Sequence, residues 1–151
     1  LGTYPGGAAP NNRFSDWADG FPGLGVANRF DDDFDKDGIP NGLEHIFGTD
    51  PTSASSSAGL RGLERRDANV VFQHRRAKEL AEDVILSYEW SLDLTNWNAS
   101  GESVEGTTVT FSNVVSDTTP LDHDLVDVTA EVSGTPANIF VRSKAQISTA
   151  N

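Results

Sequence analysis

The sequence predicts a mainly β fold, in which an antiparallel β-sandwich follows a short segment of helix and loop. From about residue 60, apolar and polar side chains alternate with a period of two, in runs separated by turn-forming residues. Before residue 60 this alternation is missing, and the chain holds a carboxylate-rich loop and a short helical pattern. Strands with one buried and one wet face, repeated along the chain, are typical of a sandwich of immunoglobulin-like type.

The clearest strand pattern is that of residues 84–92. Val84, Leu86, Tyr88, Trp90 and Leu92 share one face of it, and polar residues take most of the other face. Tyr88 and Trp90 are therefore expected in the core. The expected strands lie near residues 60–66, 70–75, 84–92, 109–111, 126–132 and 139–147.

The first part of the chain divides by composition. Residues 1–13 are rich in glycine and proline and predict an extended N-terminal arm. A short helix is expected over 14–21, with Ser15 as its N-cap and Gly20 at its end. Serines and alanines make residues 52–59 a linker. The predicted organisation is an arm at 1–13, a helical calcium-loop segment at 14–51, a linker at 52–59 and a β-sandwich at 60–151.

Residues 33–44 match the twelve-residue calcium loop at each position that defines it. Carboxylates stand at positions 1, 3 and 5, glycine at 6, an oxygen side chain at 9 and glutamate at 12. Ca²⁺ takes roughly 6 to 8 oxygen ligands, and this loop can supply that number. The alternative is a solvated acidic turn that binds nothing. The expected ligands are Asp33, Asp35, Asp37, the carbonyl group of Ile39, Asn41 and Glu44.

The neighbourhood of the loop predicts a single, unpaired site. Position 8 is Pro40, which has no N–H to donate to a partner loop, and no helix pattern leads into the loop. A short helix follows, with Leu43, Ile46 and Phe47 on its apolar face and Gly48 at its end. Calcium would thus act as a structural clamp. Lone loops of this kind are typical of extracellular modules.

Composition limits the partners and the location. The chain has 11 basic and 23 acidic residues, which argues against nucleic acid and anionic membranes as partners. It has no cysteine, and no apolar run approaches the roughly 20 residues of a membrane span. The chain begins at Leu1, so we expect a mature exported fragment, extracellular or at the cell surface.

A known pattern covers most of the chain. It comprises Trp17–Phe21, the loop at 33–44, Phe47–Pro51, Tyr88–Trp97 and Phe140–Ala145. In this order the segments resemble the C-terminal regions of large exported bacterial proteins, which carry a thrombospondin type 3-like or dockerin-like calcium segment followed by a small β-sandwich. The resemblance implies the calcium ligands named above and a surface location, and it implies no reaction.

Other polar residues give weaker signals. His45, His74 and His123 are scattered, and no serine or cysteine stands in a nucleophile-elbow context, so no enzymatic activity is expected. The acidic residues around His123 could form a second cation site, although a solvated turn is favoured. Trp97, at a turn, is a candidate for stacking on a glycan, although packing at the edge of the sandwich is favoured.

Two hypotheses of function follow. The first is a non-enzymatic, calcium-stabilised structural module that assembles with copies of itself through the N-terminal arm into a filament, layer or adhesive structure. In it, a basic face around Arg65, Arg75 and Lys78 could pair with the acidic loop of a neighbouring copy. The alternative is a carbohydrate- or cell-surface-binding module cut from a secreted enzyme.

Overall fold

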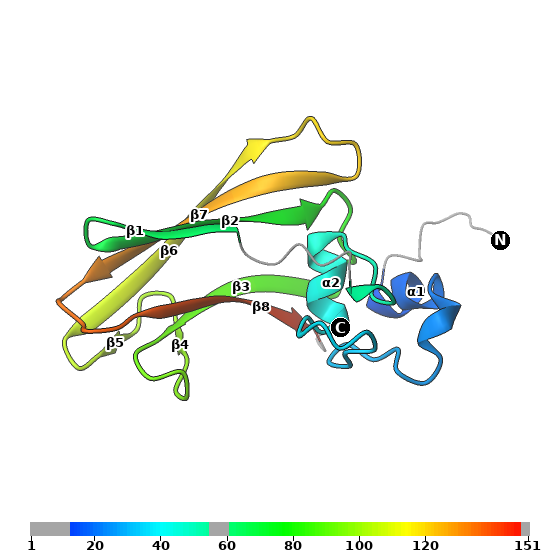
Figure 1. The fold of residues 1–151 in the computed structure, drawn as a ribbon, viewed down its shortest axis with the longest axis horizontal. Helices are drawn as coiled ribbons and strands as arrows, with labels where there is room; N and C mark the ends of the chain where they lie inside the picture. The colour runs from blue at the N-terminus through cyan, green and yellow to red at the C-terminus, as the bar shows by residue number, and fades with distance from the viewer. Residues whose placement is uncertain (1–12, 55–60, 149–151) are drawn as a thin grey trace. The chain divides into compact units, whose positions relative to one another are not determined.

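The computed structural model describes residues 13–54 and 61–148 and is mainly β (Figure 1). Of the arm predicted at 1–13, residues 1–12 lie outside the described residues, and of the linker predicted at 52–59, residues 55–59 do. The helices are α1 (Phe14–Asp19), the 3₁₀-helix η1 (Pro22–Leu24) and α2 (Asn41–Phe47). The strands are β1 (Arg61–Arg66), β2 (Asn69–Ala77), β3 (Val84–Ser91), β4 (Asn98–Ala99), β5 (Ser103–Val104), β6 (Thr107–Asp117), β7 (His123–Ser133) and β8 (Phe140–Ile147).

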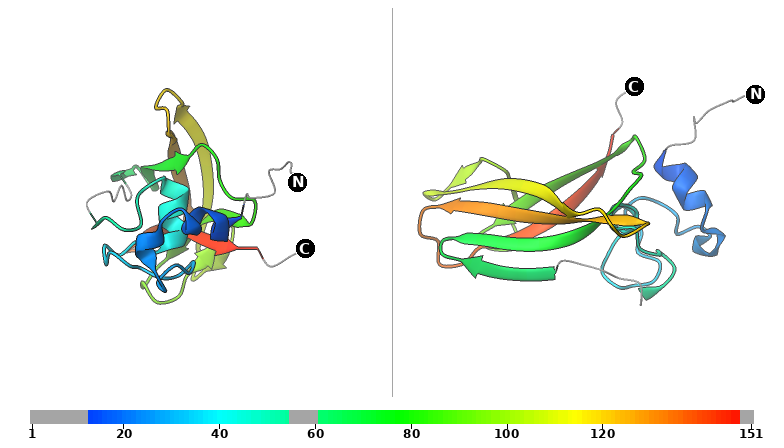
Figure 2. Two further views of the ribbon diagram at one scale, coloured as in Figure 1. Left: turned by 90° about the vertical axis from the view of Figure 1, so that its right-hand side faces the viewer. Right: turned by 90° about the horizontal axis from the view of Figure 1, so that it is seen from above.

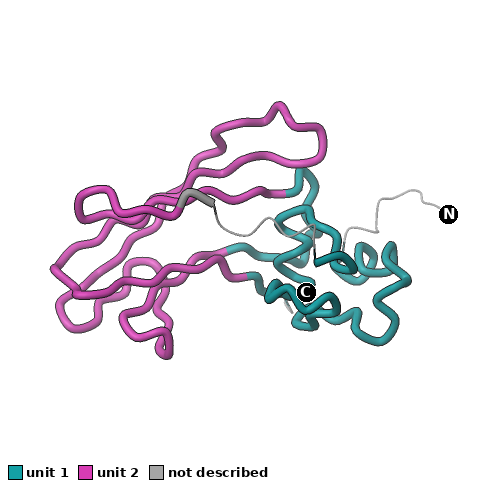
Figure 3. Tube along the Cα trace, in the orientation of Figure 1, with its two compact units in different colours: residues 1–57, 77–86, 145–151 teal, residues 58–76, 87–144 magenta. Residues whose placement is uncertain are grey.

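The chain divides into two compact units (Figure 3). The described part of unit 1 consists of residues 13–54, 77–86 and 145–148, and that of unit 2 of residues 61–76 and 87–144. Segments 77–86 and 145–148 lie in unit 1 because their apolar residues Ala81, Val84 and Ala145 pack in its core. The two compact units therefore have different boundaries from the segments that composition predicts. None of the helices in the described ranges has the length and apolarity needed to cross a membrane.

The N-cap of helix α1 lies two residues earlier than the sequence predicts. Its N-cap is Arg13, whose backbone N–H donates to the Asp16 carboxylate over 3.2 Å, so the prediction of Ser15 as N-cap is wrong. The next N–H, that of Phe14, donates to Asp83 Oδ1 over 2.8 Å, a partner 69 residues away. A distant carboxylate thus fixes the start of the helix, and Gly20 ends it as predicted.

The helix α2 ends as predicted, at Gly48, which adopts the left-handed conformation with φ of 71°. Ile46 and Phe47 of this helix pack with Phe14 and Ala18 of α1 in the core of unit 1. The ring of His45 lies 4.9 Å from that of Trp17. The aromatic residues of α1 thus cover one side of α2.

Unit 2 contains most of two sheets, with strand orders β1-β2-β7-β6-β5 and β4-β3-β8. The strands β6 and β7 form a long antiparallel hairpin, in which Thr108 lies opposite Ser133 and Asp117 opposite Leu125 (Figure 2). The strand β6 is longer than the predicted 109–111, because the pairing with β7 continues through its polar residues. The sequence gives no strand signal for β4 and β5, which have two residues each.

The core of unit 2 is built from both sheets, which gives it the character of a β-sandwich. Val70, Trp90, Val109 and Ala130 come from β2, β3, β6 and β7 and pack together, and Trp90 is fully buried. Tyr88 is also buried, so the prediction that both aromatic residues are in the core is confirmed. The immunoglobulin-like type stays a prediction.

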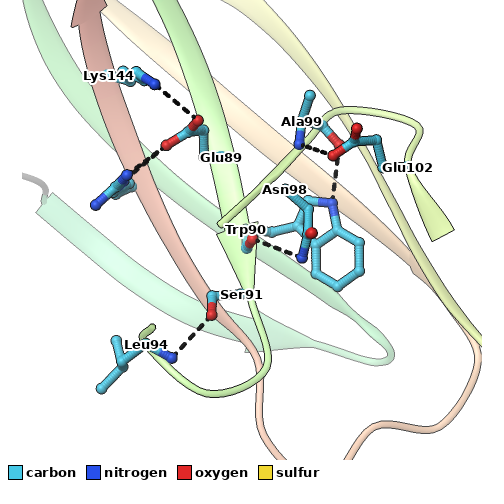
Figure 4. Close-up of polar contacts among 9 residues, drawn as sticks. Glu89, Trp90, Ser91, Leu94, Asn98, Ala99, Glu102 and Lys144 are labelled. Carbon is cyan, nitrogen blue, oxygen red and sulfur yellow. Dashed lines mark hydrogen bonds and ion pairs between the residues drawn. The ribbon is translucent and has the colours of Figure 1, made fainter. Parts of the chain in front are cut away.

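Side-chain hydrogen bonds close one side of this sandwich (Figure 4). The indole Nε1 of Trp90 donates to Ala99 O over 3.1 Å, and the backbone N–H of Ala99 donates to Glu102 Oε1 over 2.7 Å. Beyond them, the N–H of Gly101 donates to Val109 O over 2.8 Å. The segment 98–104 therefore carries the chain from β4 to β5 and holds the two sheets together at this edge.

Candidate metal centre

The carboxylates of the acidic loop each accept a hydrogen bond from a backbone N–H of the same loop. Gly38 N–H donates to Asp33 Oδ2 over 2.9 Å, Ile39 N–H to Asp37 Oδ1 over 2.8 Å, and Asp37 N–H to Asp35 Oδ1 over 3.3 Å. Gly38 has a φ of 89°, a conformation that glycine adopts without strain. One oxygen of each aspartate is thus used to shape the loop.

The second oxygen of each aspartate is buried and has no hydrogen-bond partner. These atoms are Asp33 Oδ1, Asp35 Oδ2 and Asp37 Oδ2. Carboxylate oxygens of the three residues lie within 4.8 Å of one another. Like charges held this close repel one another, and an unpaired buried polar atom costs on the order of 1 to 3 kcal/mol. The three carboxylates could therefore hold a metal ion between them.

Glu44 of α2 lies near enough for the charges of these aspartates to act on it, although it is outside the group of three with metal-ligand spacing. Its side chain is fully buried; the Thr49 hydroxyl donates to Oε2, while Oε1 has no hydrogen-bond partner. Burial, followed by the charges of Asp37 and Asp35, raises the pKa of Glu44 to about 9. A cation beside Glu44 would offset these causes and keep the carboxylate ionised.

Asn41 is the fifth side chain with an unpartnered buried oxygen. It is 1% exposed, and its Nδ2 donates to Ala27 O over 3.0 Å and to Arg29 O over 2.8 Å. These two bonds fix the amide, and its Oδ1 is left without a partner. Asn41 therefore joins the start of α2 to the segment before the loop.

Ile39, predicted to contribute its carbonyl group, lies within the same turn. Its side chain packs against the core of unit 1, so the loop is anchored on its apolar side as well. Each of the other five predicted ligand residues carries an unpartnered buried oxygen, and among the described residues Ser143 Oγ is a further such atom, outside the loop. The donors are all oxygens and four of the side chains are carboxylates, which is the chemistry that hard divalent cations prefer. The residues present fit such an ion.

Three neighbours of this site were not predicted. Thr49 holds Glu44, the ring of Phe30 lies against Gly42, and Asp32 O accepts the N–H of Asn41 over 2.8 Å. At Gly42, an added Cβ would lie 2.5 Å from the Phe30 ring, so only glycine fits without a shift. The spacing of the calcium loop contains no signal for these contacts, because they depend on residues outside its diagnostic positions.

His45, next to Glu44, packs beside the loop as predicted and is 4% exposed. Its Nε2 accepts the N–H of Ala81 over 2.9 Å, and burial lowers its pKa to about 4. Through this bond α2 holds the connection between β2 and β3, so the site, the helix and the segment 77–86 form one structural unit.

The acidic residues around His123 do not gather at one point. Asp122 pairs with Arg75 at 3.6 Å, Asp124 pairs with Arg76 at 3.5 Å, and Asp127 accepts a hydrogen bond from Gln73 over 2.9 Å. Among the residues that the structure describes, the aspartates of the loop make the one group of three with metal-ligand spacing. The favoured prediction, a solvated turn at these residues, stays a prediction.

Trp97 lies beside β8. The guanidinium carbon of Arg142 stands 3.9 Å from the centre of a ring of Trp97. Trp97 also lines a groove of about 390 Å³ with apolar residues of β1 and β8. The structure thus places Trp97 at the edge of the sandwich.

Comparison of the chain with protein-family models, with curated proteins and with solved structures gave no match. The resemblance to exported bacterial surface proteins therefore stays a prediction.

Proposed function

We propose that the chain is a non-enzymatic, calcium-stabilised structural module of an extracellular or cell-surface assembly. The observation that supports the calcium site is that five of the six predicted ligand residues carry a buried side-chain oxygen without a partner. A solvated acidic turn would turn these oxygens outward, because water then satisfies them.

Calcium suits this donor set better than magnesium. Mg²⁺ demands a near-ideal octahedron and usually keeps several waters, whereas Ca²⁺ accepts 6 to 8 oxygens in flexible geometry. Five side-chain oxygens and the carbonyl group of Ile39 make a set supplied almost entirely by protein. Such a set favours the larger ion.

The ion would act as a clamp. It would join the loop to α2, which is already tied to the preceding segment by Asn41 N–H to Asp32 O and by Gly42 N–H to Phe30 O, each over 2.8 Å. His45 of α2 accepts a hydrogen bond from the N–H of Ala81 and so links the helix to the segment 77–86. Calcium would therefore stabilise the whole of unit 1, which is a structural role and needs no reaction.

Assembly with other copies is the second half of the proposal. An acidic chain with a clamped segment and a sandwich suits a filament, layer or adhesive structure, in which the N-terminal arm contacts a neighbouring copy. Millimolar calcium outside the cell would keep a weak single loop loaded. The immunoglobulin-like type of the sandwich belongs to the same proposal.

The alternative, a glycan- or cell-surface-binding module that uses Trp97, has less support. A sugar stacks on a free aromatic face, and the Arg142 guanidinium already covers Trp97 at 3.9 Å.

Thermal unfolding with and without calcium tests the proposed clamp. The native chain should melt at a higher temperature in Ca²⁺ than in EDTA, and Asp37→Asn should remove most of that difference. The matched control is Asp31→Asn, which removes an equal charge from an exposed residue that is not a predicted ligand. Equal melting temperatures of the native chain in Ca²⁺ and EDTA would contradict the clamp.

Electron microscopy tests the proposed assembly separately. Particles or filaments are expected in calcium and should dissociate in EDTA. A chain that binds calcium yet stays monomeric at high concentration would contradict the assembly and leave the clamp standing.

A further inference from the structure

The two sides of the sandwich in unit 2 differ. The segment 98–104 closes one side, whereas on the other side β1 and β8 border a groove of about 390 Å³. The groove reaches the core, because Val70, Ile139 and Val141 belong both to its lining and to the core cluster. Leu63, at its rim, is 58% exposed. An apolar opening of this kind suits an apolar side chain from outside.

The strands beside the groove are basic in a chain with a net charge of −12. On β1, Arg65 and Glu64 both line the groove, and Arg66 forms an ion pair with Glu64 at 2.7 Å. On β8, Lys144 pairs with the carboxylate of Glu89 at 3.2 Å (Figure 4). Arg142 pairs with the same carboxylate at 2.6 Å. Each of these clusters has two cations and one anion, so an acidic partner is favoured.

The acidic loop of unit 1 carries an apolar side chain that suits such a groove. Phe34, between the ligand residues Asp33 and Asp35, is 42% exposed. Asp31, also exposed, comes shortly before it. Residues 31–50 hold seven acidic side chains against one lysine, so the segment stays negative after one divalent cation has bound.

We propose that the groove between β1 and β8 of one copy receives Phe34 and the acidic loop of a second copy. This contact rests on the self-assembly proposed above and is separate from the contact expected of the arm. It joins two different surfaces and is therefore heterologous, so it leads to a ring or to an open filament.

A symmetric contact of two grooves is disfavoured, because it would bring Arg65 and the excess charge of β8 against their own copies. An isolated Phe34 would leave its ring in water. In the heterologous contact the Phe34 ring is buried, which contributes affinity. Opposite charges also meet there, which fixes how the two copies align.

Sedimentation velocity in calcium, over a series of protein concentrations, tests this contact. The variants are Phe34→Ser and Leu63→Ser, which remove the inserted side chain and the rim of the groove. The matched control is Leu121→Ser, because Leu121 is 96% exposed and lies between β6 and β7, away from both surfaces in the sequence. Each variant is first titrated with Ca²⁺, so that only loaded chains are compared.

Both variants should weaken self-association about ten- to a hundredfold, and the control should not. Charge reversal gives a second test: Arg65→Glu and Asp31→Lys should each weaken association, and the two in one chain should restore part of it. Association of Phe34→Ser or Leu63→Ser at the native strength would overturn the contact while self-assembly stands. A native chain that stays monomeric would overturn both, although a retained calcium response would keep the clamp.

Discussion

The cores of the two units are completed in different ways. In unit 2, large side chains fill the space between the sheets, and Trp90 is fully buried with its indole N–H bonded to Ala99 O. In unit 1, Phe14 and Ile46 of the short helices pack in a second apolar cluster, beside a loop whose buried oxygens lack partners. Apolar burial thus stabilises both units, and unit 1 has, as we propose, a bound ion as a second source of stability.

This difference gives the units different sensitivities. Apolar burial depends little on pH or on ions, whereas a carboxylate site loses its attraction to a cation when the carboxylates take up protons or the ion is removed. The predictions below separate the two units by these properties.

The largest effect is expected from Trp90→Ala. The substitution removes the largest fully buried side chain and leaves a cavity, which costs about 3 to 5 kcal/mol. Denaturant unfolding should show this loss equally in Ca²⁺ and in EDTA. A loss that differs strongly between the two conditions would mean that the core of unit 2 depends on the ion.

The next effect is expected from Glu44→Gln, and its sign depends on calcium. In Ca²⁺ the variant should lose stabilisation that, for the native chain at a hundredfold excess over Kd, is about 2.7 kcal/mol. In EDTA the variant should instead be more stable than the native chain near pH 8, because Glu44 must take up a proton when the chain folds, whereas glutamine is neutral in both states.

The pH dependence of the native chain in EDTA follows from the same residue. The pKa of Glu44 is about 9 in the folded chain and near 4.5 when exposed. Between these values the folded chain keeps a proton that the unfolded chain releases, so stability from this group falls as pH rises. Glu44→Gln should flatten this slope; an unchanged slope would assign it to other groups.

A smaller effect on stability is expected in unit 2, from the protonation of His74 and from the loss of its hydrogen bond with Tyr88. Burial lowers the pKa of His74, whose Nε2 lies 2.7 Å from the Tyr88 hydroxyl. Near pH 6.5 the His74 side chain therefore binds a proton in the unfolded chain but not in the folded chain. The free energy of unfolding should fall as pH drops below that value. Tyr88→Phe should cost about 1 kcal/mol at neutral pH, measured by denaturant unfolding in calcium. No loss of stability would show that the hydrogen bond contributes nothing.

The smallest effect is expected from Lys144→Ala. Its amino group pairs with Glu89 at 3.2 Å on the surface, and such pairs contribute about 0 to 1 kcal/mol. Thermal unfolding at low and high salt should show a small loss that salt removes. A large loss would mean that the pair closes the open side of the sandwich.

The sequence predicted the features that depend on local pattern. The spacing of the calcium loop indicates five residues that carry buried, unpartnered oxygens. Gly48 ends α2 as predicted, and the alternation in 84–92 correctly places Tyr88 and Trp90 in the core. These features follow from periodicity and from backbone conformation, which neighbouring residues determine.

Features that depend on distant residues were missed. Ser15 is a good N-cap by type, yet the Asp83 carboxylate binds the N–H of Phe14 and the helix begins after Arg13. Thr49 holds Glu44 only because Gly48 turns the chain back. The assignment of 77–86 and 145–148 to unit 1 likewise depends on packing, which no local pattern contains.

Hydrogen exchange of the native chain in Ca²⁺ and in EDTA tests the central claim most directly. Calcium should slow exchange in the loop, in α2 and at Ala81, while the amides of β6 and β7 keep the same protection. Equal exchange in both conditions across residues 30–48, or a change spread evenly over both units, would contradict a calcium clamp confined to unit 1.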